Sequence, residues 1–225
     1  LVANPDITLA PECISEMLSA ARRHPLAAII VPRLVEPDGR IFVRSESVLS
    51  SVAPCVPSSA PCPDRESEIA FASGACMLVH RERFLQAGGF DDKIFLFYED
   101  DDLCLRIRRA GQTIVYAPNA VAYHKRGQSS TKTQGSIFLS RFHQAWSRVY
   151  IIRKYGLADD SLAVIARNAL KYFFALVSVD RDRQERYAGS IAGAWSALQG
   201  VAAFAQPNDR MREGAGKQGA AATVP

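Results

Sequence analysis

The stretch FLFYEDDDLCLRIRRAG, residues 95–111, places four acids in a row directly after four large apolar or aromatic residues. The acids run from Glu99 to Asp102, and a basic amphipathic pattern follows them. Like charges this close repel one another, and removing them from water raises their pKa values. The run is therefore either the solvated start of a helix, or it serves a bound cation or a proton-transfer reaction.

The residues after the acids have the spacing of a helix. Apolar side chains recur every three to four positions up to Gly111, which predicts a helix over residues 99–110. Acids in a first turn complement the helix dipole, and Asp102 and Arg106 form an i,i+4 pair. Taken alone, these effects favour a structural role for the acidic cluster.

The composition sets broad limits on the protein. The chain has 225 residues, of which 48% are hydrophobic, with a net charge of +4, which suits one domain with an attached segment or two small domains. No stripe of Lys and Arg with interleaved aromatic residues is present, so no nucleic-acid partner is expected. The five cysteines include no C-x-x-C pair, which argues against a zinc site and a disulfide framework. No signal peptide or spanning helix is visible, so we expect a cytoplasmic protein.

The order of patterns predicts an α/β sheet followed by helices. The expected elements are a helix over 11–25, strands over 27–35, 41–44 and 69–80, a helical turn over 81–90, and strands over 113–118 and 120–125 around the turn APNA. Helices that separate short strands are typical of an α/β sheet, whose ligands bind at the carboxyl ends of the strands.

Changes in composition divide the chain into segments. Residues 1–130 form the α/β block, residues 131–205 a basic helical segment, and residues 206–225 a disordered tail. Residues 45–68 are rich in Ser and Pro and predict a long flexible loop. Because the opening LVANPDITL reads as the end of a buried strand, we expect the chain to be the C-terminal part of a longer protein.

Three chemically active groups stand at expected strand ends. They are Asp6 in NPD, the acidic cluster, and His124 at the end of AVAYH. One carboxylate at such an edge can hold Mg2+ or Mn2+, and a second can take a proton from a hydroxyl. Each residue alone also has an ordinary interpretation, as a turn, helix-start or core residue. An EF-hand is excluded because DDKIFLFYEDDD lacks the central glycine.

The combined motifs resemble glycosyltransferase family 2, in its rhamnosyltransferase-like branch. NPDITLAPECISEML and GACMLVHRERFLQAGGFDDKIFLFYEDDDLCLRIRRAGQTIVYAPNAVAYHKRGQS contain, in order, the Asn-Pro-Asp, Gly-Ala, Gly-Gly-Phe-Asp, aromatic-Glu-Asp-x-Asp-Leu and Pro-x-Ala-x-x-x-His elements. The resemblance implies a GT-A-like mixed sheet flanked by helices. The first strands of that sheet would be missing from this chain, and a C-terminal helical segment would follow the sheet.

The resemblance also implies roles at the site. Asp6 would contact a divalent cation, Mg2+ or Mn2+, on the donor diphosphate, and His124 would complete the metal or diphosphate site. Asn4 takes the place of the first Asp of the family's Asp-x-Asp element, which removes one charge. Asp100 would be the general base, and Glu99 would orient the acceptor or neighbouring loops. Crowding between Glu99, Asp101 and Asp102 should raise the pKa of Asp100.

Four further residues are expected to bind substrate. Gly74 and Ala75 would let the backbone approach the sugar closely. Asp91, in the Gly-Gly-Phe-Asp turn, would lie beside the acceptor pocket and contact sugar. Asp102 matches the family pattern as well, and it would also brace the helix.

The expected function is that of an inverting glycosyltransferase in cell-envelope polysaccharide assembly. It would move a sugar, for which the branch suggests rhamnose, from a nucleotide-diphosphate donor to a hydroxyl of a glycan or lipid-linked acceptor. A non-catalytic carbohydrate- or partner-binding remnant is the alternative, since a chain without the first strands would bind donor weakly. A processive synthase is disfavoured because FHQAWSRVY lacks the Gln-x-x-Arg-Trp arrangement. The helices of residues 131–205 would either pack on the catalytic block or lie peripherally on the inner face of the membrane.

Overall fold

The computed structural model describes residues 1–44, 46–53, 64–125 and 135–204. The tail expected at 206–225 and the middle of the loop expected at 45–68 lie outside the described residues, and the division into domains stays a prediction. The first block contains β1 (Val2–Ala3), β2 (Ile7–Leu9), α1 (Cys13–Arg23), β3 (Ala27–Val35), β4 (Ile41–Phe42), β5 (Ser67–Glu68), β6 (Cys76–Val79), α2 (Arg81–Gln86), α3 (Glu99–Arg109) and β7 (Thr113–His124). The second contains α4 (Ser136–Lys154), α5 (Ser161–Val177) and α6 (Arg181–Leu198).

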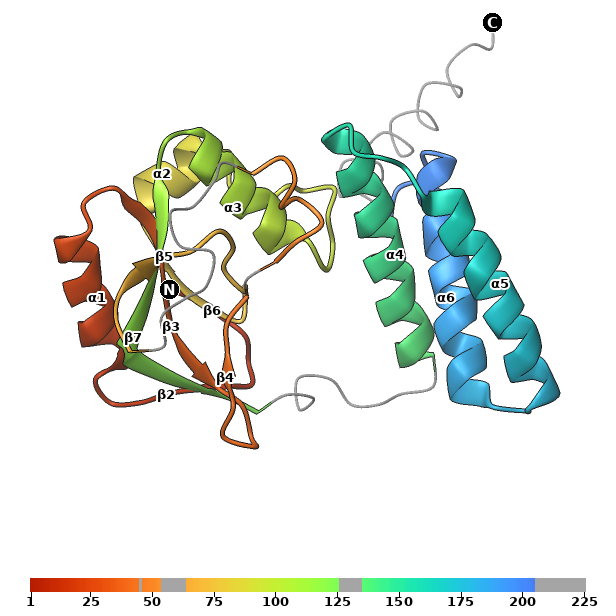
Figure 1. The fold of residues 1–225 in the computed structure, drawn as a ribbon, viewed down its shortest axis with the longest axis horizontal. Coiled ribbons are helices and arrows are strands. Elements are labelled where there is room, and N and C mark those ends of the chain that lie inside the picture. Colours follow the sequence, from red (N-terminus) through yellow and green to blue (C-terminus); the bar gives the residue numbers. More distant parts are fainter. Residues whose placement is uncertain (45, 54–63, 126–134, 205–225) are drawn as a thin grey trace, which may run out of the picture.

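The sheet is mixed, with strand order β1-β6-β3-β7-β2, and β4 and β5 pair with β3 and β7 off this path. The two long central strands, β3 and β7, are parallel, whereas the other pairings are antiparallel. Helices lie against this sheet in Figure 1. The predicted mixed sheet flanked by helices is thus confirmed.

Side chains alternate between two buried faces of the central strands. On one face, Ile29 and Ile114 join a core with Leu103 of α3. On the other, Ile30 and Val115 pack with α1. Burial on both faces explains why these strands read as nearly continuous apolar runs.

The structure corrects two strand predictions. β7 is one strand, so the two strands predicted around APNA are wrong. Its register against β3 jumps from Pro32↔Ala117 to Arg33↔Val121, which leaves Pro118 out of the pairing. A proline has no N–H for the ladder, and this irregularity lets the strand continue past it. The predicted strand 69–80 is also shorter than expected, because β6 begins only at Cys76.

The helix predictions near the site are confirmed. α2 ends before Gly88 and Gly89, whose φ angles of 86° and 67° lie in the left-handed region that glycine adopts readily. α3 begins at Glu99 and ends at Arg109, one residue before the predicted end.

Helices α4 to α6 pack together beside the sheet-containing block (Figure 1). α4 contacts that block, since Ser147 Oγ donates to the carbonyl oxygen of Leu96 at 2.9 Å. Gly189 and Gly193 of α6 lie against the α4 backbone at Phe138 and Phe142. Within the residues that the structure describes, no helix is both long and apolar enough to cross a bilayer.

Candidate active site

Strand ends and the start of α3 surround one open pocket, here called the catalytic pocket. It encloses about 820 Å³ including its open mouth. The lining comprises Asn4, Arg44, Ser73, Gly74, Ala75, Leu96, Phe97, Tyr98, Glu99, Asp100, His124 and Gln144. Five of the eight predicted site residues therefore share a single cavity, and Asp6 lies directly behind one of them, His124.

Asp6 and His124 form a buried pair at one edge of this pocket. The register of β2 against β7 places Ile7 opposite His124, and the Lys125 N–H donates to the Asp6 carbonyl oxygen at 3.0 Å. The His124 Nε2 atom lies 3.6 Å from Asp6 Oδ2, and its Nδ1 atom lies 3.7 Å from Glu36 Oε1. The imidazole is thus held between two carboxylates, of which the sequence motifs predicted only the first.

The Asp6–His124 pair offers carboxylate oxygen and imidazole nitrogen atoms, which are donor types of Mg2+ and Mn2+ sites. Carboxylate oxygen and imidazole nitrogen both suit Mn2+, and Mg2+ is commonly held by one or two carboxylates plus substrate phosphates. Among the described residues, no cluster of three or more His, Cys, Asp or Glu side chains is arranged to hold a metal ion. A cation here would therefore take most of its ligands from a bound diphosphate and water.

The acidic cluster is mostly buried. Asp100, Asp101 and Asp102 are 6%, 0% and 0% exposed, so the interpretation as a solvated helix start is wrong for these three. Arg44 lies over two of them: its Nη1 is 3.2 Å from Asp100 Oδ2 and its Nη2 is 2.9 Å from Asp101 Oδ2. The positive charge of Arg44 offsets the repulsion between these carboxylates.

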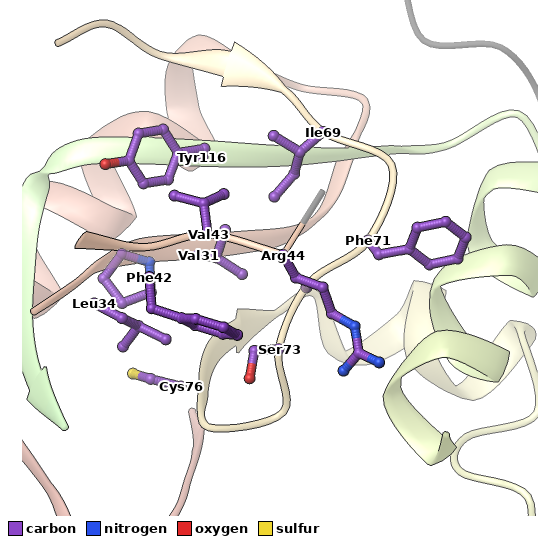
Figure 2. A pocket seen from close by; sticks show the side chains of 12 residues that line it. Val31, Leu34, Phe42, Val43, Arg44, Ile69, Phe71, Ser73, Cys76 and Tyr116 are labelled. Atoms are coloured by element: carbon purple, nitrogen blue, oxygen red, sulfur yellow. The ribbon is translucent and has the colours of Figure 1, made fainter. Parts of the chain in front are cut away.

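Arg44 follows β4 at the border between two hollows. Figure 2 shows a small apolar hollow lined by Val31, Leu34, Phe42 and Cys76, among others, with the Arg44 guanidinium extending away from those side chains. Burial raises the pKa of the Cys76 thiol to about 12, so this group stays protonated and inert. No motif indicated Arg44. The sequence suggests that buried acids need a positive charge nearby, but it does not show which residue provides that charge.

Asp100 is fixed towards the pocket by a second donor. The Gly74 N–H donates to Asp100 Oδ2 at 2.9 Å. Gly74 therefore positions the carboxylate predicted to be the base, and it also lines the catalytic pocket. Its close approach to the sugar stays a prediction.

Glu99 has the proton affinity of a group that titrates near neutral pH. Burial, and then the charge of Asp100, raise its pKa to about 7. Its Oε2 atom is buried and has no hydrogen-bond partner among the described residues. Burial also raises the pKa of Asp101 to about 6, an effect that Arg44 opposes. Burial therefore brings the pKa values of Glu99 and Asp101 up towards the neutral range.

The raised pKa of Glu99 predicts a pH-dependent loss of stability. Its folded-state pKa of about 7 exceeds the unfolded value of 4.5, so its contribution to stability is full below about pH 4.5 and is lost as pH rises through 7. The Glu99→Gln variant should therefore gain about 3 kcal/mol of unfolding free energy relative to wild type between about pH 4.5 and pH 8. Urea unfolding at both pH values measures this gain.

An exposed glutamate of α2 provides the control for this experiment. Glu82→Gln should leave the pH dependence of stability as it is in wild type, because Glu82 is fully solvated. Identical pH responses of wild type and Glu99→Gln would contradict the burial argument.

The turn before α3 holds two residues in a strained backbone conformation. Phe97 and Tyr98 have φ angles of 67° and 68°, and both line the catalytic pocket. A left-handed conformation costs a non-glycine residue about 1–3 kcal/mol and is concentrated at functional sites. These two left-handed residues turn the chain from the exposed Phe95 and Leu96 into the first turn of α3, where Glu99 and Asp100 line the pocket.

Two predicted substrate-binding residues lie outside the pocket. Asp91 accepts from Tyr150 Oη at 2.8 Å and Lys154 Nζ at 2.6 Å. Asp102 accepts from Tyr155 Oη at 2.6 Å and is paired with Lys154 at 2.7 Å. Both carboxylates anchor α4 on the first block, and neither lines the catalytic pocket. Their predicted contacts with substrate stay a prediction.

Comparisons with known proteins find similarity to glycosyltransferases. Residues 58–146 match the family model described as "Glycosyltransferase like family 2". The chain is 33% identical over 174 residues to the N-acetylglucosaminyl-diphospho-decaprenol L-rhamnosyltransferase of Mycobacterium tuberculosis, which is 66% of this chain and 57% of that relative.

Two further relatives cover shorter parts. Rhamnosyltransferase WbbL of Escherichia coli is 32% identical over 94 residues, 42% of this chain and 35% of that protein. The low-salt glycan biosynthesis hexosyltransferase Agl10 of Haloferax volcanii is 25% identical over 139 residues, 60% of this chain and 45% of that protein. The matched region thus covers between 35% and 57% of the length of these relatives. These matches confirm the resemblance found in the sequence: over part of its length the chain is similar to glycosyltransferase family 2 and to rhamnosyltransferases.

Proposed function

We propose that this chain is the acceptor-side and metal-binding part of an inverting glycosyltransferase. The enzyme transfers a sugar, rhamnose in the first instance, from a nucleoside-diphosphate donor to a hydroxyl of a glycan or lipid-linked acceptor. The proposal is carried by one observation: His124, which is paired with Asp6, lines the same cavity as Glu99 and Asp100. The names of the Mycobacterium and Escherichia relatives support rhamnose as the sugar.

On the donor side, Asp6 and His124 would hold Mg2+ or Mn2+ against the diphosphate. When bound, the cation offsets the charge that develops on the departing nucleoside diphosphate. Glu36, on the other side of the His124 ring, adds a second negative charge 3.7 Å from Nδ1. Ala75 lines the pocket with a small side chain and leaves room for the donor sugar.

On the acceptor side, Asp100 would take the proton of the attacking hydroxyl. The oxygen attacks the anomeric carbon from the face opposite the leaving diphosphate, so a bond to the acceptor forms as the bond to diphosphate breaks and the configuration inverts. Gly74 and Arg44 hold the Asp100 carboxylate in position for this step.

Glu99 is a second candidate for the proton acceptor. Its pKa of about 7 and its unpartnered buried oxygen suit a base that works near neutral pH. If Glu99 takes the proton, transfer must increase as pH rises through about 7, because the base acts in its deprotonated form. The variants that separate Glu99 from Asp100 are compared in the Discussion.

A transfer assay tests the proposed function. The intact protein is incubated with a nucleoside-diphosphate rhamnose, Mn2+ and an N-acetylglucosaminyl-diphospho-polyprenol acceptor. We expect a product heavier by one rhamnose in mass spectra, with inverted anomeric configuration by NMR. Donor binding without any transfer to glycan or lipid-linked acceptors would instead support a non-catalytic carbohydrate-binding protein.

We also propose that α5 binds peripherally to the inner face of the cell membrane. Four of its apolar side chains, Leu162, Leu170, Phe173 and Val177, are 67%, 60%, 59% and 71% exposed. α5 contains Arg167 and Lys171 but no acid, a charge that complements anionic headgroups.

Vesicle flotation checks this surface. The protein should float with vesicles containing anionic lipid and much less with neutral ones, and the Phe173→Ser/Val177→Ser variant should lose binding about tenfold. Leu85→Ser, which changes a similarly exposed apolar side chain of α2, is the matched control and should bind as wild type. Concentration-dependent dimers that these α5 substitutions abolish, with no vesicle binding, would assign the face to a second copy of the chain.

A further inference from the structure

A second hollow lies beside the catalytic pocket, between the turn preceding α3 and helices α4, α5 and α6. It encloses about 510 Å³ including its open mouth. Tyr98 and Gln144 line both cavities, so the two share a wall. Tyr98 directly precedes Glu99 and Asp100 in the chain, which places this helical hollow next to the carboxylates of the reaction.

We propose that the helical hollow binds the sugar ring of the acceptor. This inference rests on the proposed function and adds to it a binding site and a class of ligand: a neutral sugar, held by helices that lie outside the motifs of the first block.

The charge of the lining favours a neutral ligand over a phosphate. Arg148 is the one cation among the lining residues, and its Nη1 is already paired with Asp160 Oδ1 at 2.8 Å. A diphosphate would need unpaired cationic groups or a metal ion, since charge-assisted bonds to Arg or Lys dominate phosphate recognition. The lining offers neither.

The polar groups of the hollow are those that bind sugars, and they are oriented in advance. Gln144 Oε1 accepts from Arg141 Nη1 at 2.7 Å, and Asn168 Nδ2 donates to the Val164 carbonyl oxygen at 2.8 Å. Each bond fixes the direction of an amide that has capacity for further hydrogen bonds to hydroxyl groups. Ser190 adds a hydroxyl from α6.

The remaining lining matches the apolar faces of a sugar ring. Small aliphatic side chains, Ala145, Val149, Val164 and Ala194, line the same hollow as the ring of Tyr98. A sugar presents hydroxyl groups at its edge and C–H groups on its faces, so it fits a cavity that combines amides with small apolar surfaces.

The position of the hollow also suits an acceptor that is attached to lipid. α5 contributes Val164 and Asn168 to its wall, while the exposed apolar side chains of the same helix form the proposed membrane surface. A sugar bound in the hollow would therefore lie between the carboxylates of α3 and the side of the molecule from which a lipid-linked acceptor arrives.

The Asn168→Leu variant tests the proposal, because it removes the amide and fills the hollow while leaving the catalytic pocket intact. With the intact protein, we expect KM for an N-acetylglucosamine-containing acceptor to rise about tenfold or more, and kcat and the Kd of the donor to stay within about threefold. Ala169→Leu changes an exposed neighbour on α5 that does not line the hollow, and it should behave as wild type.

Two acceptors identify what the hollow holds. A neutral methyl glycoside of N-acetylglucosamine and its diphosphate-linked counterpart should suffer the same relative increase in KM in the variant. An increase confined to the diphosphate form, or an unchanged KM for both, would overturn the acceptor-sugar site. Transfer that is absent already in wild type would instead contradict the proposed function, on which this site depends.

Discussion

Replacing Asp100 with asparagine is expected to lower kcat for sugar transfer by about 10²–10⁴-fold, the usual contribution of a general base. Asparagine keeps the shape of the side chain and the bond from the Gly74 N–H, but it cannot accept the proton of the acceptor hydroxyl. The Kd of the donor should stay close to that of wild type. Steady-state transfer and calorimetric donor binding measure the two effects.

Asp101 provides a matched control for this variant. It is buried in the same turn and bonded to the same Arg44, but it does not line the catalytic pocket. Asp101→Asn should therefore retain transfer within about tenfold. Transfer by Asp100→Asn that is near wild type would remove Asp100 from the role of base.

The Glu99→Gln variant separates the two carboxylates. If Asp100 is the base, this variant keeps most of its transfer at neutral pH and loses the change in rate that is centred near pH 7, because the group with a pKa of about 7 is gone. If Glu99 is the base, transfer falls by a factor comparable to the one predicted for Asp100→Asn. The pH profile of kcat for the three proteins decides between the two assignments.

Replacing Gly193 with alanine is expected to destabilise the helical part by about 3 kcal/mol or more. An added Cβ would lie closer than 3.0 Å to the carbonyl group of Phe142, which is backbone and cannot rotate away. Alanine is by itself the better helix former by about 1 kcal/mol, so a net loss can come only from the forced separation of α4 and α6.

Thermal and urea unfolding measure this loss, with the fluorescence of Trp146 as a local reporter because its indole packs next to Ala194 and Ala197 of α6. Arg186→Ala changes an exposed residue of the same helix and should shift stability by less than about 0.5 kcal/mol. A Gly193→Ala protein as stable as wild type would show that α4 and α6 are not in this close contact.

Much of the fold follows from local patterns. The start of α3 at Glu99 and the end of α2 before Gly88 were predictable because apolar periodicity and helix-ending glycines are properties of neighbouring residues. β7 was predicted as two strands around the turn APNA, because a proline such as Pro118 usually interrupts a strand in the middle of a sheet. Only its pairing with β3 shows the register shift that accommodates this proline.

The part of the candidate site that lies at strand ends was predictable from the sequence. The contacts that depend on loops, which carry no pattern, were not. Asp6 and His124 are brought together by the pairing of β2 with β7, as expected of strand-end residues. Arg44 contacts Asp100 across 56 positions, and no pattern links the two in the sequence.

Asp91 shows that a motif does not reveal which partners a side chain has in the folded protein. It stands in a family motif, but α4 supplies the tyrosine and lysine that engage its carboxylate. A motif identifies the position of such a residue, and only tertiary packing shows whether its side chain is left available to substrate.

One pocket joins His124, paired with Asp6, to the carboxylates of α3, and the proposed function has this pair hold the donor through a cation. Titration of a nucleoside-diphosphate rhamnose in a calorimeter, with Mn2+ and with chelator, tests this most directly. We predict binding that requires Mn2+ and weakens about tenfold or more in Asp6→Asn and in His124→Ala. Asp91→Asn, a carboxylate that α4 engages outside the pocket, should bind as wild type. Donor binding that is the same with chelator, and unaffected by loss of Asp6 or His124, would contradict the account.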